Sequence, residues 1–213
     1  MKFLEISTKT KVYMSLVLVL LCTPGVAIGA DLSEMTRLGN QGDVVAQTSL
    51  GLIYYQGESV PHDYKKAFEW TQKAANQGNP RAQTGLGVMY YEGKGVPQDY
   101  KKAVEWYTKA ANQGNPLAQF RLGAMYYEGE GVRQDYHKAT EWYEKAANQG
   151  VSGAQFNLGL MYYDGHGVRQ DYKKAAEWYE KAANQGVADA QYNLGVMYNK
   201  GQGTSQDYKK ALE

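Results

Sequence analysis

From residue 42 onward, apolar residues recur at the three- and four-residue spacing that is typical of amphipathic helices. Over residues 80–92, one helical face carries Ala82, Leu86, Met89 and Tyr90. A second apolar face follows over residues 100–112, at positions 103, 106, 107, 110 and 111. The pattern therefore predicts two helices joined by a loop.

Residues that start and stop helices lie at both ends of these segments. Asn79 and Pro80 supply an N-cap and a proline at the first helical position. Gly93 ends the first helix because glycine adopts positive φ without a Cβ clash. Asp99 is the predicted N-cap of the second helix, and Gly114 closes that helix. We therefore expect helix A of this unit to begin at residue 80 and helix B to follow Asp99.

The helix pair is repeated along the chain with a constant period. The block AANQG ends at Gly78, Gly114, Gly150 and Gly186, and a weaker LGNQG ends at Gly42, so each spacing is 36 residues. A fixed period of 20–50 residues is the signature of repeat architectures. The predicted fold is all-α, with five units at 42–77, 78–113, 114–149, 150–185 and an incomplete 186–213.

Each predicted helix A has a glycine in its interior, at Gly51, Gly87, Gly123, Gly159 and Gly195. We interpret these glycines as places where helix B crosses too closely for a side chain. The tryptophans of the helix B segments are the expected large partners: Trp70, Trp106, Trp142 and Trp178. A buried tryptophan covers about 150–250 Å², roughly 4–6 kcal/mol as an upper bound, which outweighs the cost of about 1 kcal/mol for a helical glycine.

The segment from Ala82 to Ala111 follows the pattern A-x-x-x-L-G-x-x-Y-x-x-G-x-G-V-x-x-D-Y-x-K-A-x-x-W-Y-x-K-A-A. This pattern resembles the Sel-1-like repeat, a relative of the tetratricopeptide repeat, and recurs over essentially all of residues 42–213. The resemblance implies a right-handed α-solenoid that acts as an adaptor or scaffold, often exported in bacteria. A cysteine-rich subgroup of the family is linked to β-lactam binding or hydrolysis, but residues 31–213 contain no cysteine.

A line of large side chains lies opposite the apolar face of each helix A. If helix A lines the inner curve, as the resemblance implies, these residues form an aromatic stripe along a groove. Tyrosine suits recognition because it combines a large contact area with a polar tip. The predicted partner-binding residues are Tyr55, Tyr91, Tyr127, Tyr163, Phe120, Phe156 and Tyr192.

The residues of this stripe differ in whether we expect them in the core or on the surface. Phe120, Phe156 and Tyr192 could equally pack as core between neighbouring helices, whereas the tyrosines beside acids near the loop, Tyr91, Tyr127 and Tyr163, are expected to be exposed. A second candidate is one equivalent position with four different chemistries: Arg81, Leu117, Gly153 and Asp189. Such variation either encodes specificity or marks a position that only faces solvent, and we favour the second interpretation.

The net charge and the spacing of histidine and acidic residues limit the classes of function that we expect for the chain. The net charge is +1 from 23 basic and 22 acidic side chains, so no basic excess is present to neutralise a nucleic-acid backbone. His62, His137 and His166 occupy three different repeat positions, and no Cys/His cluster has metal-ligand spacing. Glu69, Glu105, Glu141 and Glu177 are 36 residues apart on a face interleaved with lysines, which indicates a solvated face. We expect no catalytic residues, no metal and no cofactor.

The first thirty residues are expected to be a signal peptide. Lys9 and Lys11 precede an apolar run from Val12 to Cys22, and small residues follow it. This order is that of a secretory signal, with cleavage near Gly29-Ala30. Eleven apolar residues are too few for a bilayer core that needs about 20. The localisation predicted is periplasmic or secreted, without membrane attachment after cleavage.

The ends of the repeat array differ from its interior. Residues 31–41 align with the end of a helix B and are expected to form an N-terminal capping half-repeat. The chain stops at Glu213, inside the fifth helix B, so we expect a fragment or a truncated product. A monomer is expected, with a dimer through the uncapped C-terminal end as the alternative.

The function predicted from these observations is an exported, non-enzymatic scaffold that binds a peptide or protein on its concave surface. The alternative is an envelope enzyme or binder that acts on β-lactams or cell-wall fragments. A truncated remnant without function is the third possibility.

Overall fold

The computed structural model describes residues 32–57 and 60–212, and the expected signal peptide lies outside these residues. Within them the chain forms ten α-helices and one short 3₁₀ turn, with no strand. The elements are α1 (Leu32–Asn40), α2 (Val44–Gln56), α3 (Tyr64–Asn76), α4 (Pro80–Glu92), α5 (Tyr100–Asn112), α6 (Pro116–Glu128), α7 (Tyr136–Asn148), α8 (Ser152–Asp164), α9 (Tyr172–Asn184), α10 (Ala188–Lys200) and η1 (Lys210–Leu212). The predicted all-α fold of repeated helix pairs is confirmed.

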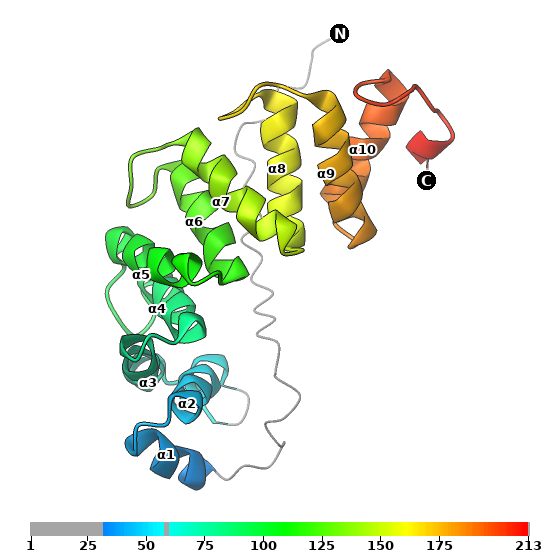
Figure 1. Ribbon diagram of the computed structural model, residues 1–213. Coiled ribbons are helices and arrows are strands. Elements are labelled where there is room, and N and C mark those ends of the chain that lie inside the picture. The colour runs from blue at the N-terminus through cyan, green and yellow to red at the C-terminus, as the bar shows by residue number, and fades with distance from the viewer. Residues whose placement is uncertain (1–31, 58–59, 213) are drawn as a thin grey trace.

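The helices stack in chain order along a curved solenoid (Figure 1). Each even-numbered helix from α2 is a helix A, and each odd-numbered helix from α3 is a helix B. In the lower half of Figure 1, α2 and α4 lie on the inner side of the curve and α3 and α5 on the outer side. Each helix packs against the next one along the chain, and the buried apolar residues form three clusters that follow one another along the array.

The helix ends follow the capping signals in the sequence. The Asn79 side chain accepts a hydrogen bond from the Ala82 amide at 3.0 Å, and Asp99 accepts one from the Lys102 amide at 3.0 Å. Gly93 ends α4 with φ +70°, in the left-handed region that favours glycine. These contacts place α4 and α5 where the sequence predicts them.

The glutamine of each AANQG block joins neighbouring repeats. Gln113 donates from Nε2 to the Gly78 carbonyl at 3.0 Å and to Gln83 Oε1 at 2.7 Å, and Gln83 in turn donates to the Ala75 carbonyl at 3.3 Å. The same bridge is formed by Gln77, Gln149 and Gln185. The block therefore recurs because its glutamine donates a hydrogen bond to a backbone carbonyl group in the turn of the preceding repeat.

The close approach at three of the helix-A glycines involves tyrosine, and Gly51 approaches Thr71 instead, so the expected partnership with tryptophan is wrong. A Cβ added at Gly87 would lie 2.6 Å from the Tyr107 ring, and one at Gly123 would lie 2.7 Å from the Tyr143 ring. Gly159 meets Tyr179 in the same way. These three tyrosines are each only 1% exposed and are the largest fully buried side chains among the described residues.

The tryptophans instead lie half-buried, one position earlier on helix B. A lysine three residues later covers each ring, with Nζ of Lys145 4.0 Å from the centre of the Trp142 ring. The Trp70 ring contacts Gly39 of α1, which covers the first repeat. The tryptophans therefore seal the outer edge of the core, between its apolar interior and a charged surface.

Candidate functional site: the concave groove

The inner side of the solenoid holds a small hollow of about 90 Å³ that is partly open to solvent. Three helix-A elements contribute to it, and the lining is mainly apolar. Its walls include Thr48, Leu52 and Tyr55 from α2, Thr84 and Val88 from α4, and Leu117 from α6. Of the predicted partner-binding residues in the first two repeats, Tyr55 lines this groove and Tyr91 does not.

Two of the residues at the variable position noted in the sequence also line the hollow. Arg81 is exposed there and Leu117 is half-buried. Both residues lie on the wall of a concave surface, and whether they contribute to binding stays a prediction. Gly153 lies instead against the Phe120 ring, at 3.2 Å from an added Cβ.

The tyrosines near the loops contact the following repeat through their hydroxyl groups. Tyr55 donates to Glu92 Oε2 at 2.6 Å, and Lys94 donates to the Tyr55 hydroxyl at 3.2 Å while pairing with Glu92 at 2.9 Å. Tyr91 donates to Glu130 Oε2 at 2.9 Å. Each ring thus bridges two repeats at the groove.

Tyr163 makes the equivalent contact with Gln202 at 3.2 Å, and the Tyr127 ring lies 6.3 Å from the ring of His166. The prediction that Tyr91, Tyr127 and Tyr163 are exposed is therefore wrong, since all three are half-buried in contacts between repeats. Their role in binding a partner stays a prediction.

The remaining stripe residues occupy three different environments. Phe120 is 9% exposed and packs against Tyr143, with ring centres 5.9 Å apart. Phe156 is half-buried and packs against Tyr179 at 5.8 Å, whereas Tyr192 is 72% exposed. The structure places Phe120 in the core, Phe156 at its edge and Tyr192 on the surface.

Several tyrosine hydroxyl groups of the repeats have raised pKa values and are neutral phenols. Burial, with the hydrogen bond to Glu92 as the next cause, raises the pKa of Tyr55 to about 12. Burial also raises the pKa of Tyr91, Tyr107 and Tyr143 well above the usual value. These hydroxyl groups therefore remain protonated at neutral pH and do not act as anions.

Arg121 on α6 is a buried charged residue that the sequence analysis missed. It is only 7% exposed, and its Nε and Nη1 atoms are buried without a hydrogen-bond partner. Charged residues are almost never buried unless they are paired, so sequence patterns assign an isolated arginine to the surface. One feature of the sequence points to Arg121: the equivalent residues of the other repeats, at positions 49, 85, 157 and 193, are all uncharged.

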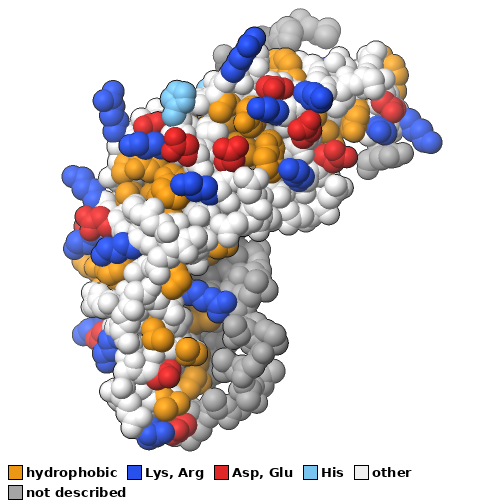
Figure 2. Space-filling model, viewed as in Figure 1, with side chains coloured by type: hydrophobic (Ala, Val, Ile, Leu, Met, Phe, Trp, Pro, Cys, Tyr) orange, Lys and Arg blue, Asp and Glu red, His pale blue; other side chains and the backbone are white. Residues whose placement is uncertain are grey.

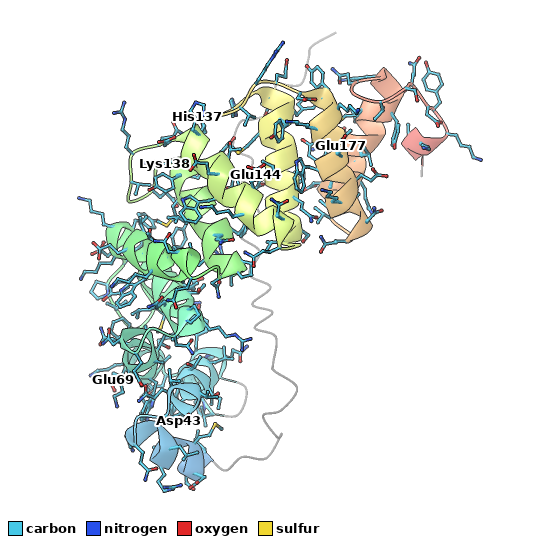
Figure 3. All side chains as sticks on the ribbon, in the orientation of Figure 1. Asp43, Glu69, His137, Lys138, Glu144 and Glu177 are labelled. Carbon is cyan, nitrogen blue, oxygen red and sulfur yellow. The ribbon has the colours of Figure 1, made fainter. Side chains whose placement is uncertain are left out.

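The described part of the chain gathers few groups that could carry chemistry. No three His, Cys, Asp or Glu side chains there lie close enough to hold a metal ion. Figure 3 shows Glu69 on α3 and Glu177 on α9 at distant parts of the solenoid. On the face seen in Figure 2, basic and acidic side chains are intermixed, without a large patch of one sign. None of the described helices has the length and apolar character needed to cross a membrane.

The four described helix pairs and α10 can be compared with known repeat families. The Sel1 repeat pattern matches residues 44–79, 80–115, 116–151, 152–187 and 188–213. The chain belongs to the Sel1 repeat family. Each matched Sel1 repeat begins at the first residue of a helix A, two residues after the units defined by the NQG period.

Solved structures of other Sel1 repeat proteins are similar to this chain. A protective antigen of uropathogenic Escherichia coli strains is 40% identical, with a TM-score of 0.82, over 86% of this chain and 41% of that one. A Sel1 repeat protein from Oxalobacter formigenes is 39% identical, with a TM-score of 0.77, over 85% of this chain and 53% of that one. This chain therefore spans about half or less of the length of these two relatives. A comparison with curated proteins finds no match.

Proposed function

We propose that this Sel1 repeat protein is an exported, non-enzymatic scaffold that holds a peptide or protein segment along its concave side. The Sel1 solenoid is typical of protein–protein interaction scaffolds, and the family is generally non-enzymatic. The observation that carries the proposal is the mainly apolar hollow between α2, α4 and α6. A concave apolar surface with a few polar groups at its margin is the usual form of a binding site.

Two observations support export. Residues 1–30 have the charged, apolar and small-residue segments of a secretory signal. The similar Escherichia coli protein is described as a protective antigen, and we take this description as support for export. N-terminal sequencing of the protein recovered from cells that express it is expected to begin at Ala30 or Asp31. A chain that still begins at Met1 would contradict export by this route.

A charge placed in the hollow tests the binding site. Peptides are selected from a random display library on the full-length protein and then measured against Leu117→Asp. We expect this variant to weaken their binding at least about tenfold, because an apolar peptide side chain would face an unpaired carboxylate. Affinity is measured by fluorescence anisotropy.

The matched control is Glu105→Lys, a charge change at an exposed position on α5. This control is expected to bind the selected peptides as the wild type does. Equal binding by the Leu117→Asp variant, or failure of the library to yield any binder, would exclude the concave hollow as the binding site.

A further inference from the structure

The apolar hollow lies where small residues replace large ones in the repeat. Thr71 of α3 lines it, and the equivalent residues of the later repeats are fully buried tyrosines: Tyr107, Tyr143 and Tyr179. Thr48 and Thr84 also line it, at the repeat position where the third and fourth repeats have phenylalanines that pack against these tyrosines, Phe120 and Phe156. The first repeat therefore lacks the pair of aromatic rings that fills the equivalent space further along the array.

Gly85 on α4 also lines the hollow and widens it. The equivalent residues of the other repeats all have a side chain: Ser49, Arg121, Asn157 and Asn193. Arg121 and Asn157 are each only 7% exposed, so a side chain at this position reaches into the buried part of the array. A Cβ added at Gly85 would lie 3.4 Å from Thr71 Cγ2, an ordinary contact, so no neighbour forces a glycine here. Because a glycine inside a helix lowers its stability, the framework itself gains nothing from Gly85.

The size and lining of the hollow limit what it can hold. Its floor is apolar and buried, with Ala82, Val88 and Met89 each at most 5% exposed. The hydroxyl groups of Thr48 and Thr84 donate to carbonyl groups of their own helices at 2.7 Å, so they do not seek a polar ligand. An apolar cavity of about 150 Å³ holds benzene. The volume of about 90 Å³ therefore suits a smaller apolar group, of the size of a branched aliphatic side chain.

Arg81, in the first turn of α4, places a positive charge at the rim of the hollow. Its side chain is exposed, and it forms no ion pair within residues 32–57 and 60–212. None of the described residues that line the hollow is acidic. The charge at the rim therefore favours a ligand that carries a carboxylate next to its apolar group.

We infer that the hollow binds one branched aliphatic side chain, of leucine, isoleucine or valine, in a peptide that carries an acidic side chain close to it. The aliphatic group leaves water for the apolar floor that Thr71 and Gly85 leave open, and the acid pairs with Arg81 at the rim. This inference rests on the proposed peptide-binding function and adds the side chains that the concave surface selects.

The first test is a selection from the same random peptide library on three full-length proteins. The wild type is expected to enrich peptides with leucine, isoleucine or valine near an acid. Gly85→Asn, which introduces the residue of the fourth repeat, is expected to lose the aliphatic enrichment because its side chain fills the hollow. The matched control Ser49→Asn makes the same residue at the equivalent position of α2, outside the hollow, and is expected to keep the enrichment.

The outcome on the wild type separates this inference from the proposed function. Binders without a preference for branched aliphatic residues would overturn the inference and leave the proposed function standing. No binders at all would overturn the proposed function.

The second test varies the size of the bound side chain. One selected peptide is made with valine, leucine or phenylalanine at its aliphatic position and measured by fluorescence anisotropy. On the wild type, the phenylalanine peptide is expected to bind at least about tenfold more weakly than the leucine peptide, because the ring exceeds the space. On Gly85→Ala, the added methyl group is expected to weaken the leucine peptide at least about threefold more than the valine peptide. Equal affinities on the wild type, or the same order and ratios on both proteins, would overturn the inference.

The third test concerns the charge at the rim. Changing the acid of the selected peptide from glutamate to glutamine is expected to weaken binding to the wild type about threefold, as is usual for an exposed ion pair. The same change is expected to leave binding to Arg81→Gln unaltered, because the partner charge is already gone. Equal losses on both proteins would overturn the pairing of the acid with Arg81.

Thermal unfolding separates binding from structure. Gly85→Asn and Gly85→Ala are both expected to melt at the wild-type temperature or above it, because each residue is a better helix former than glycine and enters open space. A large fall in the melting temperature of both variants, or failure of both to fold, would show that the space beside Gly85 is already filled in solution and would overturn the inference.

Discussion

Replacing Tyr143 by alanine is expected to lower the free energy of unfolding by about 3–5 kcal/mol, the usual range for removing a large aromatic side chain from a core. The Tyr143 ring is 1% exposed and fills the space beside Gly123 and Phe120, so its loss leaves a cavity between α6 and α7. Urea denaturation followed by circular dichroism measures the effect.

The adjacent tryptophan is the natural comparison. Trp142→Ala is expected to cost only about 1–2 kcal/mol, because the half-buried ring loses part of an apolar contact and one cation–π interaction with Lys145. Equal losses for the two variants would contradict the assignment of Tyr143 as the central core residue.

Gly123 provides a second control on the same contact. In the wild type, Gly123→Ala is expected to destabilise, because its methyl group would lie 2.7 Å from the Tyr143 ring. In the Tyr143→Ala background the same change is expected to stabilise by about 1 kcal/mol, since alanine is the better helix former. If Gly123→Ala destabilises the wild type but stabilises the Tyr143→Ala variant, the two residues are in direct contact.

Gly131→Ala is expected to destabilise by about 3 kcal/mol or more, through strain and steric overlap together. Gly131 has φ +70°, and an added Cβ would overlap the Tyr100 carbonyl at the start of α5 in the preceding repeat. The overlap is with backbone, which cannot rotate away as a side chain does. The melting temperature and the urea midpoint of the full-length protein both report the change.

Gly150→Ala is the matched control, because it isolates the cost of the backbone angle. Gly150 has φ +87° and no atom within 4 Å of an added Cβ, so about 1 kcal/mol of strain is expected. If Gly131→Ala and Gly150→Ala lost the same free energy of unfolding, the tight contact between the Gly131 loop and the preceding repeat would be excluded.

The helices and their ends could be predicted from the sequence because the signals are local and repeated. Asn79, Asp99 and Gly93 act within a few residues of their own position, and the period of 36 shows the same signals several times. The choice between Trp142 and Tyr143 as the core residue could not be predicted in the same way. These neighbours are large aromatic residues on one broad face, and the helix crossing decides which of them meets Gly123.

The groove was only partly predictable for a related reason. The positions of Leu52, Tyr55 and Val88 on one helix face follow from spacing, and they line the hollow. The hydroxyl contacts of Tyr55 and Tyr91 depend on the loop of the following repeat, which the curvature of the solenoid brings within reach. Arg121 contradicts the general tendency of unpaired charges to lie in water, so only the structure reveals it.

The glutamine bridges have an evolutionary consequence. Gln113 contacts Gln83, 30 residues earlier, and Gln149 makes the identical contact with Gln119. Unequal recombination duplicates or removes one 36-residue repeat. The glutamine donors and acceptors on the two sides of the new junction therefore still match. Length polymorphism can arise in such a gene without loss of folding, and a longer array extends the inner surface that it offers to a ligand.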